Sequence, residues 1–354
     1  MPTDQPKTRV YLTVDVECRE ERRVGGKVQP PAGYDLRIWG RFRNQRRDLG
    51  IGLIMGELDR YGFAATMYLD PFGSLHFGRE PFREVCQEIR ERGHDLQVHA
   101  HPIQREASWI TKGVKPPPDK MNEYDREGQA AVLREALDLF ADAGVPREAL
   151  GSFRAGHFAA NENTWRAMAD VGLKVSSNFN PSYVTKGVCK IDWTGAAGGL
   201  FDTGHGVWEL PISNFLQATG GQRHVQITAV SLAEIVDYLE QARSMRMPEV
   251  TIVTHSFEYF HIDDEAEGHG RANTVNVRRL RGLAKFLDRH RDRFEVDTTG
   301  ALASRLPEES VAPIGGVPRG SKLLYGARQV AQAFKRLEAK VPAIEPVARV
   351  IVRV

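Results

Sequence analysis

The stretch GHDLQVHAHP, residues 93–102, joins an apolar run to two histidines and then a proline. Its apolar positions suit a buried strand, and side chains two positions apart on a strand point to the same face. His99 and His101 are therefore expected to converge where that strand ends.

Segments typical of strands and helices alternate on both sides of this stretch. The strand candidates are residues 9–15, 63–70, 94–100, 151–155, 173–178, 207–211, 249–255 and 293–297. The helix candidates are residues 48–62, 80–93, 122–144, 162–172, 232–243 and 274–290. Such alternation predicts a mainly parallel sheet with helices outside it. About seven units favour an α/β fold of the incomplete (β/α)7-barrel type over a doubly wound sheet.

Local signals predict where several of these helices begin and end. We expect Asp48 to cap the first helix and Gly62 to end it. Asn161 is expected to cap the helix at 162–172, and Ser231 with Glu234 has the pattern of a capping box.

Composition narrows the class of protein. The chain has 354 residues, 41% of them hydrophobic and 27% charged, with a formal net charge of +2. This charge argues against a general nucleic-acid-binding protein, which is usually strongly basic. Cys18, Cys86 and Cys189 are too few and too far apart for a disulfide framework or a CxxC metal site. Without an apolar signal core or an apolar run of about 18 residues, a cytoplasmic protein is expected.

The end of the chain differs from the rest, so we predict a barrel over residues 1–306 and a basic amphipathic extension over 307–354. Residues 319–354 contain eight Lys or Arg and two acidic residues. The apolar positions fall on one helix face and are Leu323, Ala327, Val330, Phe334, Leu337 and Val341. Such a helix over 319–341 either lies on an anionic membrane surface, at the inner membrane face, or packs on the barrel or a second subunit.

Carboxylates at another strand end complement the two histidines. Asp15 and Glu17 are also two positions apart, at the end of the first strand. Since the carboxyl ends of barrel strands meet at one mouth, the four side chains are expected to gather there. Three of them would bind a divalent metal and one carboxylate would remain as a base. Two imidazoles with one carboxylate suit zinc, and also iron, cobalt or nickel.

Three further residues at strand ends are candidates for the chemistry. His255 ends the run TIVTH and would act as a general acid, because imidazole titrates near neutral pH. Arg154 would hold the free carboxylate ionised. His157 lies in the turn that follows, where its backbone N–H would stabilise an oxyanion. Each also has a purely structural interpretation as a hydrogen-bonded or ion-paired residue.

Two insertions interrupt the alternation. Residues 19–47 hold nine Lys or Arg against three acidic residues, with Trp39 and Arg41 among the aromatic and cationic candidates for contacting substrate. Aromatic rings among cations suit a phosphorylated or sugar-bearing ligand, although a solvated loop fits the pattern equally well. Residues 109–122 contain KPPPDK, whose prolines predict a stiff lid or linker.

Four segments together carry a resemblance to a known family. TVDVE at 13–17, GHDLQVHAHP at 93–102, FRAGHFAANENTWRAMADVGLKVSSN at 153–178 and the stretch from VTIVTHSFEYF at 250–260 to RFE at 293–295 occur in the order of the motifs of the polysaccharide deacetylase (NodB-homology) superfamily. The chain looks most similar to its WalW-like branch, found in bacterial surface-polysaccharide gene clusters. The resemblance covers about Arg9 to Leu302 and implies an incomplete barrel that removes an N-acyl group, usually acetyl, from an amino sugar with the help of a metal.

The resemblance also implies roles for individual residues. Asp15 would be the catalytic base, His99 a metal ligand, Arg154 the tether of the base and His255 the general acid. The chain departs from the family pattern at Val16 and Ile103, where the second aspartate and the second histidine usually stand. Their substitutes as metal ligands would be Glu17 and His101.

Two other functions fit the same pattern. An amidohydrolase-type metal hydrolase also uses HxH at a barrel strand, but normally on the first strand. A barrel that has lost catalysis and serves as a sugar-binding or assembly component would explain the departures at Val16 and Ile103. For the deacylase, the expected substrate is an amino sugar linked to a nucleotide or a lipid, with no nucleic-acid partner; the oligomeric state is left open.

Overall fold

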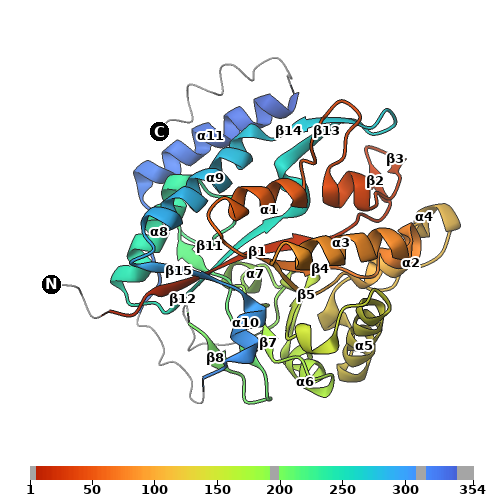
Figure 1. Ribbon diagram of the computed structural model, residues 1–354, viewed down its shortest axis with the longest axis horizontal. Coiled ribbons are helices and arrows are strands. Elements are labelled where there is room, and N and C mark those ends of the chain that lie inside the picture. Colours follow the sequence, from red (N-terminus) through yellow and green to blue (C-terminus); the bar gives the residue numbers. More distant parts are fainter. Residues whose placement is uncertain (1–4, 192–198, 308–315, 341–354) are drawn as a thin grey trace.

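The computed structural model describes residues 5–191, 199–307 and 316–340, although nothing is described of the side chains of 334, 335 and 337–340. Its main sheet has the order β12-β1-β4-β5-β6-β7-β9-β8, and β15 also pairs with β1 (Figure 1). All neighbours are parallel except β8 and β9. The strands are β1 (Thr8–Val16), β4 (Thr66–Leu69), β5 (Asp95–Ala100), β6 (Ser152–Ala155), β7 (Val175–Ser176), β8 (Phe201–Asp202), β9 (Trp208–Glu209), β12 (Glu249–His255) and β15 (Phe294–Asp297).

The chain that follows β9 links this end of the sheet back to β12. Ser213 donates its backbone N–H to the Thr251 carbonyl at 3.3 Å, and Ile227 donates its own to the Val253 carbonyl at 3.0 Å. The parallel sheet therefore curls into an incomplete barrel, which confirms the predicted α/β architecture. These hydrogen bonds to β12 come from residues in irregular loops, and not from a further long strand.

Helices cover the outside of the curled sheet (Figure 1). The longer ones are α1 (Ile51–Asp59), α3 (Arg79–Glu91), α5 (Arg126–Asp142), α6 (Glu162–Asp170), α8 (Leu232–Ser244) and α9 (Thr274–Arg289). The predicted caps of α6 by Asn161 and of α8 by Ser231 with Glu234 are confirmed, both as capping boxes. The predicted cap of α1 is wrong: Gly50 holds that position, because the Asp48 side chain pairs with Arg41 instead, at 3.6 Å.

The remaining elements are short and lie mostly in the loops. They are β2 (Arg22–Val24), β3 (Lys27–Gln29), the π-helix η1 (Tyr34–Trp39), α2 (Ser74–Phe77), η2 (Pro102–Glu106), α4 (Trp109–Lys112), η3 (Met121–Glu123), η4 (Arg147–Ala149), η5 (Gly156–Phe158), α7 (Pro181–Val184), β10 (Asn214–Leu216), β11 (Gln222–His224), η6 (Ser256–Tyr259), β13 (Phe260–Asp264), β14 (His269–Ala272) and α10 (Thr299–Ser304). The basic insertion thus contains a hairpin and a π-helix, and is not an unstructured loop.

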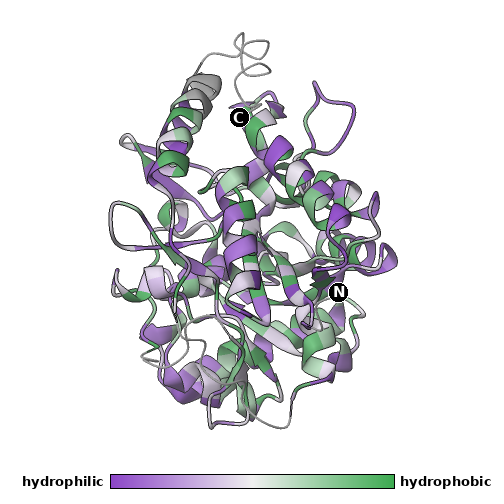
Figure 2. Ribbon diagram, turned by 90° about the vertical axis from the view of Figure 1, so that its left-hand side faces the viewer, coloured by the Kyte–Doolittle hydropathy of each residue, from purple (hydrophilic) through white to green (hydrophobic). Residues whose placement is uncertain are grey.

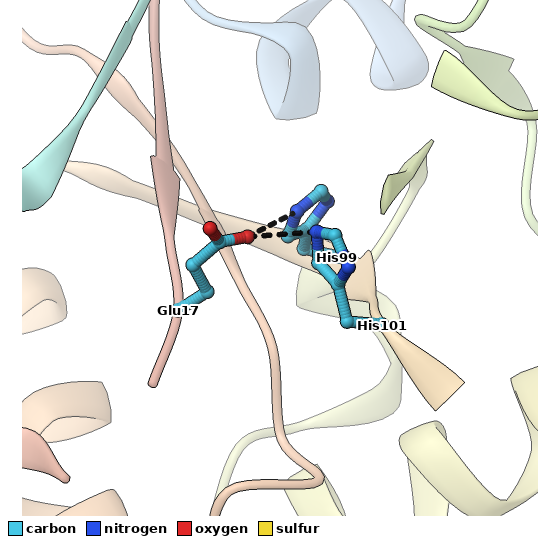
Figure 3. A group of neighbouring side chains, drawn as sticks. All are labelled: Glu17, His99 and His101. Carbon is cyan, nitrogen blue, oxygen red and sulfur yellow. Dashed lines mark hydrogen bonds and ion pairs between the residues drawn. The ribbon is translucent and has the colours of Figure 1, made fainter. Parts of the chain in front are cut away.

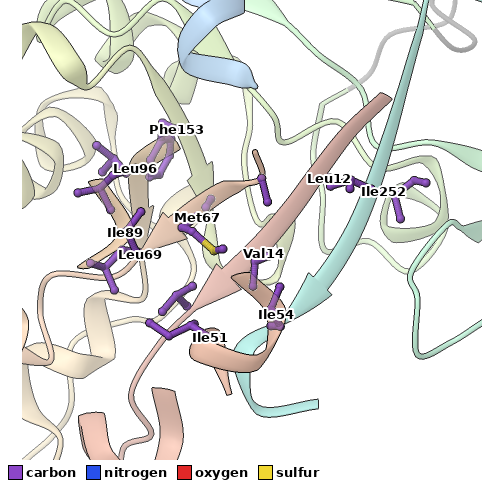
Figure 4. Packing of buried hydrophobic residues seen from close by; sticks show 14 of the residues in the cluster. Leu12, Val14, Ile51, Ile54, Met67, Leu69, Ile89, Leu96, Phe153 and Ile252 are labelled. Carbon is purple, nitrogen blue, oxygen red and sulfur yellow. The ribbon is translucent and has the colours of Figure 1, made fainter. Parts of the chain in front are cut away.

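Successive side chains of a strand point to opposite faces of the sheet, so one face of β1 packs into the hydrophobic core and the other faces the candidate site. Leu12 and Val14 of β1 belong to one buried cluster with Met67 of β4, Ile51 and Ile54 of α1 and Ile252 of β12; Leu12 lies beside Ile252, and Val14 lies near Ile54 (Figure 4). Each such buried aliphatic side chain contributes about 1.5–3 kcal/mol relative to an exposed one. The alternate residues of β1 point the other way, so Thr13 and Asp15 face the inside of the barrel.

The C-terminal helix α11 (Lys322–Lys340) packs against α8. Arg328 is buried at this contact and pairs with Glu234 at 3.2 Å, whereas Leu323 and Val330 of the predicted apolar face are 81% and 52% exposed. Of the other predicted positions, Val341 lies outside the described residues and the side chains of 334 and 337 are not described. Hydrophobic and hydrophilic residues are interspersed along the outer helices (Figure 2). Among the described helices, none is both long and apolar enough to cross a bilayer.

Candidate metal centre and active site

The predicted site residues come from the carboxyl ends of β1, β5, β6 and β12. His99 of β5 pairs in register with Arg154 of β6, and Asp15 of β1 with His255 of β12. Paired positions on parallel strands place side chains on the same face of the sheet. The structure therefore gathers on one face residues that lie up to 240 positions apart in the chain.

Glu17, His99 and His101 form a compact triad (Figure 3). Glu17 Oε2 lies 2.8 Å from His101 Nε2 and 3.3 Å from His99 Nε2. Burial raises the pKa of Glu17, but the two facing imidazoles outweigh burial and hold it well below its usual value. The triad is thus one ionised carboxylate with two imidazole nitrogens aimed at it.

The outer nitrogens of both imidazoles also have acceptors. His99 Nδ1 lies 2.7 Å from the Arg154 carbonyl, and His101 Nδ1 lies 3.1 Å from both carboxylate oxygens of Asp119. A histidine whose Nδ1–H donates to such a partner presents an unprotonated Nε2 to a metal. The donor set therefore fits a divalent cation with three protein ligands, which is typical of catalytic zinc sites.

Asp15 lies beside this triad and is held by Arg154. Arg154 Nη1 donates to Asp15 Oδ1 at 2.7 Å and to Thr13 Oγ1 at 2.9 Å, and the arginine side chain is fully buried. Its Nη2 donates to Ser177 Oγ at 2.9 Å, and its guanidinium carbon lies 4.3 Å from the centre of the Tyr68 ring. A buried guanidinium with this many fixed partners holds the Asp15 carboxylate in one orientation.

His255 lies on the other side of Asp15. Its Nε2 is 3.8 Å from Asp15 Oδ2, and its Nδ1 is 3.4 Å from Glu258 Oε1. Burial lowers the pKa of His255, but Glu258, Asp15 and Glu17 outweigh burial and raise it to about 9. His255 is therefore protonated at neutral pH and suited to donate a proton.

Sequence reasoning missed Glu258, which the structure places as the partner of His255. Burial raises the pKa of this carboxyl, yet His255 and several donors lower it to about 2. Glu258 accepts hydrogen bonds from Gln226 and Thr228 at 2.6 Å each, and from Thr254 at 2.9 Å. The only sequence signal was an acidic residue three positions after a histidine that ends a strand.

Two more carboxylates that the sequence did not reveal surround His101. Asp119 lies within hydrogen-bond distance of both His101 and His157, although the sequence KPPPDK predicts only a stiff segment. Asp70, which follows β4, accepts the backbone N–H of His101 at 2.7 Å. Burial raises the pKa of Asp70 to about 6 despite the nearby histidines.

His157 lies in a strained turn at the edge of the site. It has φ +58° and Phe158 has φ +55°, values that side chains other than glycine rarely adopt. Such strain costs on the order of 1–3 kcal/mol per residue and concentrates at functional sites. The His157 side chain is half exposed and its Nε2 lies 2.8 Å from Asp119 Oδ2.

The structure places Trp39 and Arg41 among other partners. Trp39 is buried at the end of η1, and Arg41 pairs with Asp35, Asp48 and Glu84. Arg37, which lies on η1 four residues before Arg41, stacks on the Phe257 ring with 3.1 Å between its guanidinium carbon and the ring centre. Burial lowers the pKa of Arg37 to about 10, partly offset by Glu17. Arg37 is therefore a cation of this insertion that interacts electrostatically with Glu17 of the triad.

A cavity of about 700 Å³ lies elsewhere, between α1 and α9. Among the described residues, none of the predicted site residues lines it. Its wall carries several arginines, but Glu57 accepts hydrogen bonds from both Arg60, at 3.1 Å, and Arg281, at 2.7 Å. This pairing is typical of a solvated helix surface.

Comparisons with known proteins identify the fold. Neither a protein-family model nor a curated protein matches the chain. Among solved structures, a Mycobacterium smegmatis protein provisionally assigned as a polysaccharide deacetylase is similar with a TM-score of 0.52 and 14% identity, over 89% of this chain and 96% of that one. A Parabacteroides distasonis protein provisionally assigned as a glycoside hydrolase/deacetylase gives 0.53 and 9%, over 85% and 71%.

A third similar structure has a different activity. The 4-alpha-glucanotransferase from Thermococcus litoralis gives a TM-score of 0.52 and 9% identity, over 98% of this chain and 48% of that one. At such low identity these likenesses show the fold alone, and one fold carries many activities. The chemistry of this chain therefore has to be argued from its own residues.

Proposed function

We propose that the protein is a metal-dependent hydrolase that removes an N-acyl group, acetyl in the usual case, from an amino sugar in a cell-surface polysaccharide or glycolipid pathway. We place it in the polysaccharide deacetylase superfamily, on the WalW-like branch. The observation that carries the proposal is the triad Glu17, His99 and His101 with Asp15, held by Arg154, and a protonated His255 at its side. These groups can supply the activated water, the base and the acid of a metal-dependent amide hydrolysis.

The metal would be held by Glu17, His99 and His101, with zinc proposed and iron, cobalt or nickel as alternatives. When bound, a divalent ion at this site polarises the amide carbonyl and lowers the pKa of a water molecule. Glu17 and His101 thus take the place of the ligands that the usual family pattern has at Val16 and Ile103.

The protein's own residues move the protons. Asp15 accepts a proton from the water whose oxygen forms the new bond to the acyl carbon, and Arg154 holds Asp15 in place through its hydrogen bond. The backbone N–H of His157 donates to the developing oxyanion. His255 donates its proton to the sugar nitrogen as the C–N bond breaks, and Glu258 keeps His255 protonated before that step. The products are a free carboxylate and an amino sugar.

Metal analysis and acetate release test this proposal together. The purified protein is stripped with a chelator, reloaded with zinc and assayed for acetate release from N-acetylglucosamine oligomers, from a nucleotide-linked N-acetylamino sugar and from a lipid-linked one. We expect one zinc per chain and zinc-dependent release from at least one substrate. A wild-type protein that holds no stoichiometric metal, neither zinc nor iron, cobalt or nickel, would support the catalytically degenerate sugar-binding barrel instead. Zinc without release from any acetylated sugar would favour an amidohydrolase-type enzyme.

We also propose that the substrate is met at the cytoplasmic face of the inner membrane. The support is α11, which exposes Leu323 and Val330 beside the exposed cations Lys322 and Arg336. Apolar and basic side chains on one exposed helix suit the surface of an anionic membrane. In this arrangement the barrel over 1–306 is the catalytic unit and the segment 307–354 is its membrane contact.

A further inference from the structure

Asp119 lies between two imidazoles just outside the triad. Its carboxylate oxygens are 3.1 Å from His101 Nδ1, and Oδ2 is also 2.8 Å from His157 Nε2. The rings of His101 and His157 meet edge to face with 4.9 Å between their centres. His101 thus contacts Glu17 through one ring nitrogen and Asp119 through the other.

His101 is held at two more points, one on its ring and one on its backbone. A Cβ atom added at Gly156 would lie 2.5–2.7 Å from three atoms of that ring, so glycine is the residue that leaves it room. The backbone N–H of His101 donates to Asp70 Oδ2 at 2.7 Å. Backbone, ring face and outer nitrogen are therefore each fixed by a different segment of the chain.

The insertion that carries Asp119 is itself anchored at both ends. Thr111 donates its backbone N–H and its hydroxyl to Glu21, at 2.6 and 2.7 Å. At the other end, the Tyr124 hydroxyl donates to the Pro118 carbonyl at 2.7 Å. Pro116, Pro117 and Pro118 restrict the chain just before Asp119. The carboxylate is thus presented to His101 by a stiff segment.

We propose that Asp119 is a positioning residue that holds His101 as a metal ligand, with Nδ1–H donating to Asp119 and Nε2 directed to the metal. This inference rests on the proposed function and assigns a role to the insertion over 109–122. Carboxylates behind a metal-bound histidine fix its tautomer and orientation, and removing them typically weakens metal binding about 10–100-fold. The insertion is therefore part of the metal site and not only a cover for it.

A direct measurement of zinc affinity tests the role of Asp119. We compare the wild type with Asp119→Ala, Asp119→Asn and the matched control Glu123→Gln, a carboxylate of the same region that pairs only at the surface with Lys120. Zinc dissociation constants come from competition with a chromophoric chelator at fixed pH. We expect Asp119→Ala to weaken binding about 10–100-fold. Asp119→Asn should recover part of this loss, because its amide oxygen still accepts the Nδ1–H bond, and Glu123→Gln should bind like the wild type.

The outcomes separate this inference from the proposed function. If the wild type binds zinc and Asp119→Ala, folded by circular dichroism, binds it equally well, the inference fails while the proposed function stands. If the wild type binds neither zinc nor iron, cobalt or nickel, the proposed function fails. Asp119, His101 and His157 could alternatively hold a second cation of their own, since their ligand atoms all lie within 4.8 Å of one another. Two zinc ions per wild-type chain, falling to one in Asp119→Ala, would overturn the positioning role.

Discussion

Asp15 and His255 are register partners on the neighbouring parallel strands β1 and β12, with 3.8 Å between Asp15 Oδ2 and His255 Nε2. The proposed base and the proposed acid are therefore positioned by the sheet itself. Each has one buried partner on its far side, Arg154 for Asp15 and Glu258 for His255. The two partners carry opposite charges: the Arg154 guanidinium orients the Asp15 carboxylate, and the Glu258 carboxylate helps to raise the pKa of His255.

Replacing the base should separate metal binding from turnover. Asp15→Asn keeps the shape of the side chain but cannot accept the proton of water, so we expect kcat to fall about 10²–10⁴-fold. Zinc content should stay near that of the wild type, because Asp15 is not one of the triad ligands. Acetate release and metal content measured on the same preparation check this. A fully active Asp15→Asn would refute the assignment of the base.

Replacing a proposed metal ligand should remove both zinc binding and turnover, whereas replacing the base removes turnover alone. Glu17→Gln and His99→Ala each leave two ligands of the triad, so we expect both proteins to lose stoichiometric zinc and, with it, activity. Asp35→Asn, a change of an exposed carboxylate on η1, is the control and should retain both. Zinc retained by Glu17→Gln would show that the metal is held elsewhere.

Removing the partner of the acid should change the dependence of kcat on pH. A general acid must be protonated, so the rate falls as pH rises through its pKa, which Glu258 helps to raise to about 9 in His255. In Glu258→Gln the carboxylate charge is lost, the pKa of His255 moves toward its ordinary value, and the alkaline limb should shift to lower pH. An alkaline limb at the same pH in both proteins would contradict the role of His255.

Zinc binding should release protons near pH 7. In the metal-free protein, burial lowers the pKa of His101, but Asp119 and Glu17 outweigh it and hold this pKa well above its usual value. The metal takes the unprotonated Nε2, so a proton must leave, and affinity should rise with pH. Calorimetric titration in two buffers with different ionisation enthalpies measures the release. Equal observed enthalpies in both buffers would show that His101 is already unprotonated.

Removal of the C-terminal segment tests the proposed membrane contact. Truncation after Leu306 should abolish sedimentation with anionic liposomes while the barrel still unfolds cooperatively. Leu323→Asp is a milder variant, because this side chain is 81% exposed and its replacement should leave folding intact. Undiminished sedimentation of the truncated protein would exclude α11 as the membrane contact.

The site residues that could be predicted from the sequence are those placed by the alternation of side chains along a strand. His99, His101, Asp15 and Glu17 lie at strand ends two positions apart, and a period of two is visible in the sequence. Asp119 and Glu258 come from loops, where the direction of a side chain depends on the path of the whole segment. For the same reason the structure gives Trp39 and Arg41 partners outside the triad, and brings Arg37 toward Glu17.

The same distinction holds for the helices. Capping boxes at Asn161 and Ser231 are local patterns, and both were predictable. The start of α1 was not, because a tertiary contact with Arg41 takes Asp48 away from the helix end. The contact of α11 likewise includes a buried ion pair, Arg328 with Glu234, which helix periodicity does not reveal.

Gly156 offers a way to recognise functional relatives. Because its missing Cβ leaves the space that the His101 ring occupies, a relative with alanine at this position would have to swing the imidazole out of the coordination geometry. A bare HxH pattern is common by chance. HxH at the end of one strand, combined with glycine in the turn after the next strand, is a more specific sequence pattern. Searches of unassigned genomes that require both should separate competent enzymes from barrels that keep the histidines as remnants.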